Sequence, residues 1–389
     1  MRPANHSTLN AALVAGETSG DLLAGLLLDG LRSRWPELHS AGIGGQQMVQ
    51  RGFQAWWGYD KLSVHGFGWD VIRRYPEIMG IRAQLKKRLL LERPDVFIGV
   101  DAPDFNLDLE AALKHSGIKT VHFVCPSVWA WRPERLEKIK RSVDVMLCIF
   151  PFEPAFLAQH GIAATYVGHP LANVVPMQPD RAAARLQLGL PANCPVVAIF
   201  PGSRLSEIKH IALRCFRAAA LIHQAKSATK FIVSAVPFLQ SHIMAAAVAC
   251  NMQEKLLIVN GQSHPALAAC DVALVASGTA TLEAALFKRP MVITYAVSAL
   301  SWQIMRRKQL QPWVGLPNIL CQQFVVPEFL QDAATPPALA NAVLTWLEDS
   351  VHQPAKIMQI EQRFAALHRE LQQDTPHLAT HAIENILSL

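Results

Sequence analysis

Residues 274–286 read LVASGTATLEAAL, and this stretch decides the fold class. An apolar run with the composition of a buried strand ends at a small turn formed by Ser277, Gly278 and Thr279, and a helical pattern follows at once. The helix start exposes backbone N–H groups that favour an anion, and a single carboxylate, Glu283, lies about one turn further on. An ordinary helix start with a surface glutamate is the alternative interpretation.

The alternation of short apolar runs and helical patterns extends over most of the chain. Candidate strands cover 11–15, 95–100, 120–124 and 145–150 in a first block, and 196–200, 231–236, 256–259, 272–276 and 291–295 in a second. A proline-rich connector, 168–195, separates the blocks. This pattern predicts an α/β protein with two Rossmann-like, doubly wound parallel-sheet domains that face a cleft. We expect an N-terminal domain over 1–172, a C-terminal domain over 173–353, and helices in 354–389 that pack back on the N-terminal domain.

The composition narrows the class and location of the protein. No apolar run approaches the roughly 18 residues that a membrane-spanning helix needs, and the first residues lack the pattern of a signal peptide. The seven cysteines are scattered without a CxxC pair, which predicts reduced thiols, no zinc site and a cytoplasmic location.

The net charge of +6 favours anionic partners, and much of the basic excess lies in 82–93, 132–141 and 306–308. Two of these segments lie close to tryptophans, which among anionic partners favours a membrane surface. Solvated helix faces explain the same charges equally well. No motif supports nucleic-acid binding.

Two turns in the first block carry candidate cleft residues. In VAGETSGD, Thr18 and Ser19 follow the first strand, and Thr18 with Asp21 also fits a capping box. In GVDAPDF, Asp101 directly follows a strand, where a general base would point into the crevice. Asp104 is explained equally well as the N-cap of the next helix. We therefore assign the catalytic base to Asp101.

The second block contains a turn that is typical of a phosphate site. In FPGSR, Gly202 and Ser203 form a tight turn after a strand, with free N–H groups that are expected to point outward, and Arg204 lies at the start of the next helix. A cation at a helix N-terminus is unfavourable unless an anion lies between them, so the turn predicts a bound phosphate.

Two further residues in this block favour a nucleotide. Glu283 follows Thr279 by four residues, which is out of register for a capping box, and a carboxylate there could bind ribose hydroxyls. Asn318, in the turn 314–320, could read the edge of a nucleobase.

Taken in order, the motifs LVAGETSGD, DVFIGVDAPDFN, PSVWAWR, PFE, GHP, PGSR, ASGTATLE and LPN resemble those of the lipid-A-disaccharide synthase family, glycosyltransferase family 19. The resemblance covers about residues 13–320. It implies an inverting GT-B hexosyltransferase of Gram-negative lipid A (lipopolysaccharide) biosynthesis. Such an enzyme joins UDP-2,3-diacylglucosamine to 2,3-diacylglucosamine 1-phosphate (lipid X), makes the β-1,6-linked lipid A disaccharide 1-phosphate and releases UDP. It also implies no cofactor and no metal.

The resemblance assigns roles to the residues of the second block. Arg204 and the turns 202–203 and 277–279 would hold the UDP diphosphate, Glu283 the ribose and Asn318 the uracil. Asp101, in the first block, would accept the proton of the acceptor 6-hydroxyl.

The remaining candidate residues lie in the first block and line the cleft. Ser19 is expected near the donor, and the acceptor side comprises Thr18, Asp104, Ser127, Trp129 and Arg132. Basic residues in 132–141 would receive the phosphate of lipid X. The family context also implies peripheral contact with the cytoplasmic face of the anionic inner membrane, and it leaves homodimer formation open.

The sequence departs from the family pattern in LSVHGFGWDVI (62–72), where His65 replaces the usual methionine and Trp69 falls near the usual glutamate. Acyl-chain preference is therefore left open, as is compensation by Asp70. The alternatives are another GT-B enzyme, either a UDP-GlcNAc-dependent transferase or a 2-epimerase, and a catalytically inactive lipid or sugar-nucleotide binding protein.

Overall fold

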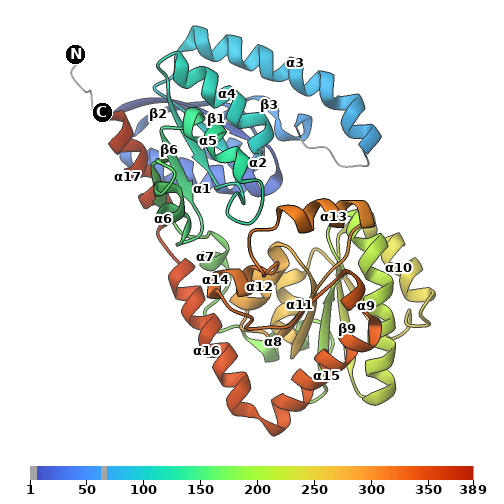
Figure 1. Ribbon diagram of the computed structural model, residues 1–389. Coiled ribbons are helices and arrows are strands. Elements are labelled where there is room, and N and C mark those ends of the chain that lie inside the picture. The colour runs from blue at the N-terminus through green and yellow to red at the C-terminus, as the bar shows by residue number, and fades with distance from the viewer. Residues whose placement is uncertain (1–6, 63–67, 389) are drawn as a thin grey trace. The chain divides into compact units, whose positions relative to one another are not determined.

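The computed structural model describes residues 7–62 and 68–388 and divides into two compact units (Figure 1). Unit 1 comprises Met1–Pro170 and Leu371–Leu389, and unit 2 comprises Leu171–Glu370. His65 lies outside the described residues, as do the side chains of Trp69 and Asp70. The effect of these departures from the family pattern on acyl-chain preference therefore stays a prediction.

Unit 1 is built on a seven-stranded parallel sheet with the strand order β3-β2-β1-β4-β5-β6-β7. Its strands are β1 (Thr8–Ala15), β2 (Glu37–Gly44), β3 (Gln54–Gly58), β4 (Val96–Val100), β5 (Lys119–Phe123), β6 (Val145–Cys148) and β7 (Ala164–Tyr166). Its helices are α1 (Thr18–Arg34), α2 (Gln46–Val49), α3 (Gly68–Glu92), α4 (Pro103–His115), α5 (Leu136–Ser142), α6 (Glu153–Ala158) and α17 (Thr375–Leu387).

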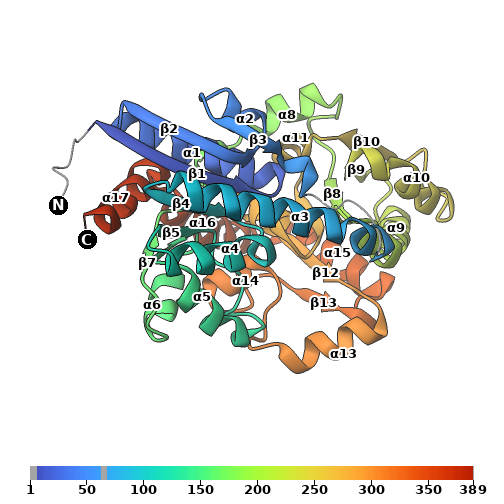
Figure 2. The ribbon, with the colours of Figure 1, turned by 90° about the horizontal axis from the view of Figure 1, so that it is seen from above.

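Both faces of this sheet are covered, which explains its continuous apolar strands. Leu13 of β1 belongs to a core formed with α1 and α17, whereas the adjacent Val14 belongs to a second core formed with α3 and α4. Although α17 ends the chain, it packs on α1, and a Cβ on Gly30 would lie 2.4 Å from the carbonyl oxygen of Pro376 (Figure 2).

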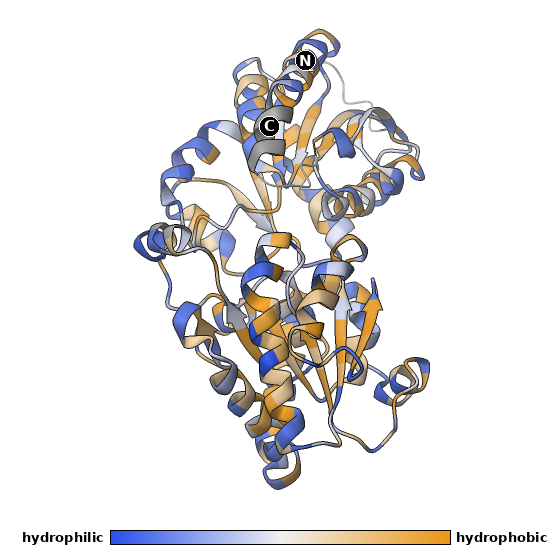
Figure 3. Cartoon of the chain, turned by 90° about the vertical axis from the view of Figure 1, so that its right-hand side faces the viewer, coloured by the Kyte–Doolittle hydropathy of each residue, from blue (hydrophilic) through white to orange (hydrophobic). Residues whose placement is uncertain are grey.

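Unit 2 is built on a six-stranded parallel sheet with the strand order β10-β9-β8-β11-β12-β13. Its strands are β8 (Val196–Phe200), β9 (Lys230–Ala235), β10 (Leu256–Asn260), β11 (Val272–Ala276), β12 (Met291–Tyr295) and β13 (Glu328–Leu330). Its helices are α7 (Leu171–Val174), α8 (Arg181–Gln187), α9 (Leu205–Ala225), α10 (Gln240–Val248), α11 (Ser263–Ala269), α12 (Thr279–Leu286), α13 (Ala299–Lys308), α14 (Leu316–Cys321), α15 (Pro336–His352) and α16 (Pro354–Leu371). Figure 3 shows that much of its sheet is hydrophobic.

The prediction that both C-terminal helices pack back on the first domain is wrong for α16. Nearly all of α16 belongs to unit 2. There His368 is fully buried, and its Nε2 lies 2.7 Å from the carbonyl oxygen of Ala172 while its Nδ1 lies 2.6 Å from Lys288 Nζ. Of the two helices, only α17 packs within unit 1.

Two further properties follow from the described residues. All seven cysteines lie within the described ranges and are free thiols, as their spacing predicts. Within 7–62 and 68–388, every helix is too short or too polar to cross a bilayer.

Each sheet has one point at which the order of its strands reverses. In unit 1 this topological switch point lies between the neighbouring strands β1 and β4, and in unit 2 it lies between β8 and β11. Ligands of open α/β sheets bind at the carboxyl ends of the strands at such points. All four turns singled out in the sequence therefore lie at a switch point, two in each unit.

Candidate functional site

At the switch point of unit 1, Asp101 follows β4 in a backbone conformation that is rare for its residue type. Asp101 and Ala102 both lie in the left-handed region, with φ of 53° and 45°. Ala102 touches the turn after β1, because a Cβ on Gly16 would lie 2.6 Å from the Cβ of Ala102. The half-buried side chain of Asp101 thus lies at the junction of two turns, as expected for a group that meets a ligand.

The capping box, the alternative interpretation of Thr18 and Asp21, is wrong. The helix α1 begins at Thr18, and its N-cap is Glu17, which forms no side-chain cap. Asp21 is instead buried, and its carboxylate accepts from the N–H groups of Gly45 (2.7 Å) and Gln47 (2.9 Å). Thr18 is exposed, so it can contact a ligand, and its Oγ1 lies 3.3 Å from the hydroxyl of Tyr59. Ser19 is exposed beside it.

The alternative role of Asp104 as an N-cap is also wrong. The helix α4 begins at Pro103, and its N-cap is Ala102. The side chain of Asp104 is 83% exposed and accepts a hydrogen bond from Arg135 Nη2 at 2.7 Å. Asp104 therefore lies on the surface near the basic segment 132–141.

The proposed cleft residue Trp129 is part of the core, which corrects the sequence interpretation. It is 5% exposed, and its Nε1 donates to the carboxylate of Glu153 at 2.9 Å. Burial raises the pKa of Glu153 to about 8, against hydrogen bonds from the Phe150 N–H and from Trp129 that lower it. Ser127 is exposed, so it can still contact a ligand.

Arg132 lies beside the exposed tryptophan of the same segment. Its guanidinium lies 4.1 Å from the centre of the Trp131 ring, a cation–π contact. Trp131 is 39% exposed, so this pair, unlike Trp129, lies at the surface of unit 1.

In unit 2 the PGSR turn has the expected conformation but not the expected free donors. Gly202 has a φ of 124°, and a Cβ at this position would lie 2.5 Å from the Cβ of Glu207. The carboxylate Oε2 of Glu207 accepts from the N–H groups of Ser203 (2.8 Å) and Arg204 (3.2 Å). The prediction that these N–H groups face a phosphate is therefore wrong in this conformation.

The guanidinium of Arg204 is available as a donor at this turn. Its side chain is 77% exposed, and its Nη1 lies 3.3 Å from Glu207 Oε1. Glu207 was missed in the sequence because a glutamate in a first helical turn has an ordinary explanation as a helix-stabilising acid. In the structure it fixes the turn that carries Arg204.

In the turn after β11, Ser277 is already hydrogen-bonded to neighbouring backbone groups, whereas the N-terminus of the following helix has no side-chain cap. Ser277 donates its N–H to the carbonyl of Thr294 (2.9 Å) and its Oγ to the carbonyl of Val314 (3.1 Å). The helix α12 then begins at Thr279, with Gly278 as an N-cap that forms no side-chain cap. The anion-binding capacity of this turn thus comes from the N-terminus of α12 rather than from Ser277.

Glu283 lies one turn into α12 and faces a histidine that the sequence analysis missed. Its side chain is 17% exposed, and its Oε2 lies 3.6 Å from Nε2 of His264 at the start of α11. Burial raises the pKa of Glu283, whereas the His264 charge and a hydrogen bond from Ser263 lower it. The one signal in the sequence that could have indicated a role for His264 is its position shortly after the end of β10.

Asn318 cannot read a nucleobase in this conformation, which corrects its predicted role. Its side chain is fully buried, and its Oδ1 accepts from the N–H groups of Val325 (2.8 Å) and Val326 (3.1 Å). Its Nδ2 donates to the carbonyl of Val326 (2.9 Å) and to Glu328 Oε1 (2.8 Å). All of its hydrogen-bonding capacity serves the connection between α14 and β13.

Replacing Asn318 by alanine is therefore expected to lower the free energy of unfolding by about 2–4 kcal/mol, because buried groups lose their partners. Urea denaturation of the variant measures this change, and Asn341→Ala on the exposed side of α15 is the matched control. A variant with the stability of the unmodified protein but weaker UDP binding would instead support the nucleobase role.

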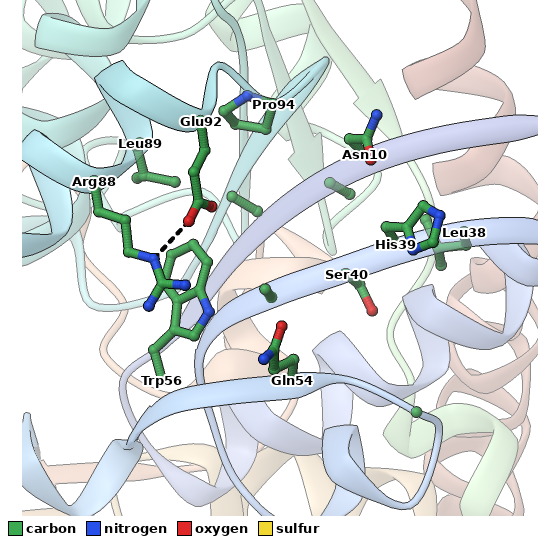
Figure 4. A pocket seen from close by; sticks show the side chains of 14 residues that line it. Asn10, Leu38, His39, Ser40, Gln54, Trp56, Arg88, Leu89, Glu92 and Pro94 are labelled. Carbon is green, nitrogen blue, oxygen red and sulfur yellow. Dashed lines mark hydrogen bonds and ion pairs between the residues drawn. The ribbon is translucent and has the colours of Figure 1, made fainter.

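A cavity of about 380 Å³ lies elsewhere in unit 1, between β2, β3 and α3 (Figure 4). The guanidinium of Arg88 lies 3.7 Å from the centre of the Trp56 ring, and its Nε donates to Glu92 at 2.7 Å. None of the site residues predicted from the sequence lines this cavity. In the described ranges, no group of three or more His, Cys, Asp or Glu side chains is arranged to hold a metal ion.

Two doubly wound parallel sheets, each with polar residues at its switch point, define the GT-B class of fold. Solved structures show the same architecture. The Anabaena protein HepE in complex with UDP and glucose aligns with a TM-score of 0.60 at 16% identity, covering 98% of this chain and all of that one. UDP-GlcNAc 2-epimerase from Neisseria meningitidis bound to UDP-GlcNAc aligns with a TM-score of 0.58 at 11% identity, covering 98% of this chain and all of that one.

Within this class, the chain belongs to the lipid-A-disaccharide synthase family. The family model described as lipid-A-disaccharide synthetase matches residues 11–383. The lipid-A-disaccharide synthase of Albidiferax ferrireducens is 72% identical over 379 residues, 97% of each chain. That of Verminephrobacter eiseniae is 59% identical over 388 residues, all of each chain. The resemblance and the fold class predicted from the sequence are confirmed.

Proposed function

We propose that the protein is an inverting glycosyltransferase that joins UDP-2,3-diacylglucosamine to 2,3-diacylglucosamine 1-phosphate (lipid X). The products are the β-1,6-linked lipid A disaccharide 1-phosphate and UDP. The observation that carries this proposal is the pair of turns at the unit 2 switch point, where Arg204, the N-terminus of α12 and Glu283 follow adjacent strands. A cation, a helix N-terminus and a carboxylate together suit a nucleoside diphosphate.

On the donor side, Arg204 and the N-terminus of α12 bind the diphosphate, and Glu283 accepts hydrogen bonds from the ribose. As the bond between C1 and the phosphate oxygen breaks, negative charge develops on the diphosphate. Arg204 and the α12 N–H groups stabilise that charge in the transition state. The turn 202–203 contributes its close backbone approach rather than the Ser203 N–H group, because Glu207 accepts from the N–H groups of Ser203 and Arg204.

On the acceptor side, Asp101 accepts the proton of the 6-hydroxyl of lipid X while that oxygen attacks C1. The new bond forms on the face opposite the departing diphosphate, which inverts the anomeric centre, and UDP leaves with the bonding electrons. Thr18, Ser127 and Arg132 are exposed or half-exposed and suit contacts to the acceptor, with Arg132 directed to its phosphate.

The decisive assay incubates the protein with both diacylated substrates and measures disaccharide and UDP. The synthase function requires UDP release that depends on lipid X. Release of UDP without lipid X would favour hydrolysis or epimerase-type chemistry, and binding without turnover would favour an inactive sugar-nucleotide binding protein.

Glu283→Gln is expected to weaken UDP binding about tenfold, because a hydrogen bond to a charged acceptor becomes one to a neutral group. The variant should bind UDP and 2′,3′-dideoxy-UDP with nearly equal affinity in calorimetric titrations. Glu254→Gln, an exposed glutamate in the same unit, is the control. Unchanged discrimination between the two nucleotides would remove Glu283 from the ribose site.

We propose further that the reaction needs no metal ion or other cofactor, since Arg204 and α12 supply the positive potential that a metal would supply elsewhere. Incubation with EDTA followed by gel filtration is expected to leave kcat unchanged. A loss of activity that Mg²⁺ or Mn²⁺ restores would contradict this proposal.

We also propose that the protein acts peripherally on the cytoplasmic face of the anionic inner membrane. Exposed basic side chains in 132–141 and the Arg132–Trp131 pair support this location. Flotation with phosphatidylglycerol vesicles, but not with phosphatidylcholine vesicles, is the expected result. Sedimentation velocity tests whether the protein forms a homodimer, which the sequence leaves open.

A further inference from the structure

The backbone of Asp101 is held at both its amide and its carbonyl. Its N–H donates to the carbonyl of Phe123 in β5 at 2.8 Å, and its own carbonyl accepts from Asn106 Nδ2 at 2.8 Å. The same Nδ2 lies 3.5 Å from the carbonyl oxygen of Val14 in the neighbouring strand β1. A non-glycine residue keeps a positive φ only where surrounding contacts enforce it. Asn106 supplies one of these contacts.

Asn106 is in turn fixed by complete burial against β4. A Cβ on Gly99 would lie 2.8 Å from the Cβ of Asn106 and 2.1 Å from Glu110 Oε1, so the absence of a side chain at Gly99 makes room for both. Glu110 Oε1 lies 2.7 Å from His122 Nδ1, and both of these side chains are fully buried. Asn106, Glu110 and His122 thus form a buried polar cluster in unit 1, which we call the Asn106 cluster.

The Asn106 cluster opposes folding more than an apolar core would. Asn106 Oδ1, Glu110 Oε2 and His122 Nε2 are buried and have no hydrogen-bond partner among the described residues. Buried polar groups without partners are unfavourable, so stability alone favours apolar side chains here. Polar groups retained at such a cost are expected where they serve a functional site, and Asn106 contacts the residue that carries the proposed base.

We propose that Asn106 is a positioning residue for the transfer reaction. By holding the carbonyl of Asp101, it keeps Asp101 and Ala102 in the left-handed conformation that directs the Asp101 carboxylate to the acceptor hydroxyl. Glu110 and His122 fill the space against β4 and hold Asn106 in place. The inference rests on the proposed function, because Asn106 acts only through Asp101.

The first test is the variant Asn106→Ala in the full-length protein. Loss of the hydrogen bond to Asp101 is expected to lower kcat about 10²-fold through misplacement of the base, while UDP affinity and the KM for the donor stay unchanged. The matched control is Thr120→Val. Thr120 is fully buried at the start of β5 and donates to the carbonyl of Ser142, so its loss destabilises unit 1 without touching Asp101.

The second test is rescue by Ala102→Gly. Glycine adopts the left-handed conformation without a steric penalty, so the double variant Asn106→Ala/Ala102→Gly should recover kcat about tenfold over Asn106→Ala. The same glycine in the Thr120→Val background should give no gain. If Asn106→Ala does not fold, Asn106→Asp, which has the same shape without the donor, takes its place.

The inference is overturned if the Asn106 variants keep near-normal kcat, if Thr120→Val loses as much kcat, or if glycine gives no rescue. Asp101→Ala separates this failure from failure of the proposed function. When Asp101→Ala abolishes turnover but Asn106→Ala does not, only the positioning role is wrong. When Asp101→Ala keeps turnover, the assignment of the base itself is wrong. In support, adding Asn106→Ala to Asp101→Ala should lower kcat no further.

Discussion

Asp101→Ala is expected to lower kcat by about 10²–10⁴-fold, the range that a positioned general base contributes. Asp101 follows β4 at the unit 1 switch point, and its backbone is held from both sides. Among the residues that the structure describes, no other carboxylate combines a position at a strand end with a left-handed backbone next to a second turn. Calorimetry should show UDP affinity unchanged, because Asp101 belongs to unit 1, whereas Arg204 and Glu283, which are proposed to bind the diphosphate and the ribose, belong to unit 2.

The control for this experiment is Asp108→Ala on α4. Asp108 is a carboxylate on the surface of the same unit, paired with Arg82 and Lys138. Its loss should leave kcat near the value of the unmodified protein. Near-normal turnover in Asp101→Ala would show that another group accepts the proton.

The central strands of both sheets could be predicted from the sequence because they are buried on both faces. Their apolar runs are continuous, and the positions 95–100, 196–200 and 272–276 agree with β4, β8 and β11 to within one residue. The edge strands β3, β7 and β13 and the strand β2 were not predicted. β3, β7 and β13 are only half-buried or exposed, and β2 mixes polar and glycine residues in ELHSAGIG, so none of them has a long apolar run.

The turns of the site could be located from the sequence, whereas the partners of their side chains could not. The spacing of Thr18 and Asp21 fits a local cap, but Asp21 binds the N–H groups of Gly45 and Gln47, more than twenty residues away. Asn318 likewise binds residues up to ten positions downstream. A local motif cannot reveal that a polar side chain is already occupied by a distant backbone group.

Glu207 shows the same limit at the nucleotide site. The sequence alone predicts that the PGSR turn offers free N–H groups, because that is the usual property of a glycine turn before a helix. In the structure, a carboxylate from the first turn of α9 accepts from both N–H groups and lies beside the Arg204 guanidinium. Arg204 therefore carries more of the proposed diphosphate contact than the sequence pattern suggested.

Arg204→Ala is expected to lower kcat by about 10²–10³-fold, because the charge that develops on the leaving diphosphate loses its guanidinium. Unlike Asp101→Ala, it should also weaken UDP binding, which calorimetry measures directly. Arg204→Lys keeps the charge but loses the forked pair of donors, so its kcat should fall between that of the unmodified protein and that of Arg204→Ala.

Arg217→Ala is the matched control for this series, since Arg217 is an exposed arginine on the same helix, α9, more than three turns from Arg204. It should leave both kcat and UDP affinity unchanged. If Arg204→Ala behaves like this control, Arg204 does not bind the diphosphate, and the N-terminus of α12 alone holds it. The contact between Glu207 and Arg204 would then have no role in catalysis. If Arg204→Ala loses kcat but keeps UDP affinity, Arg204 acts only in the transition state. We expect Arg204→Ala to lose both kcat and UDP affinity, because its exposed guanidinium lies beside the switch point of unit 2.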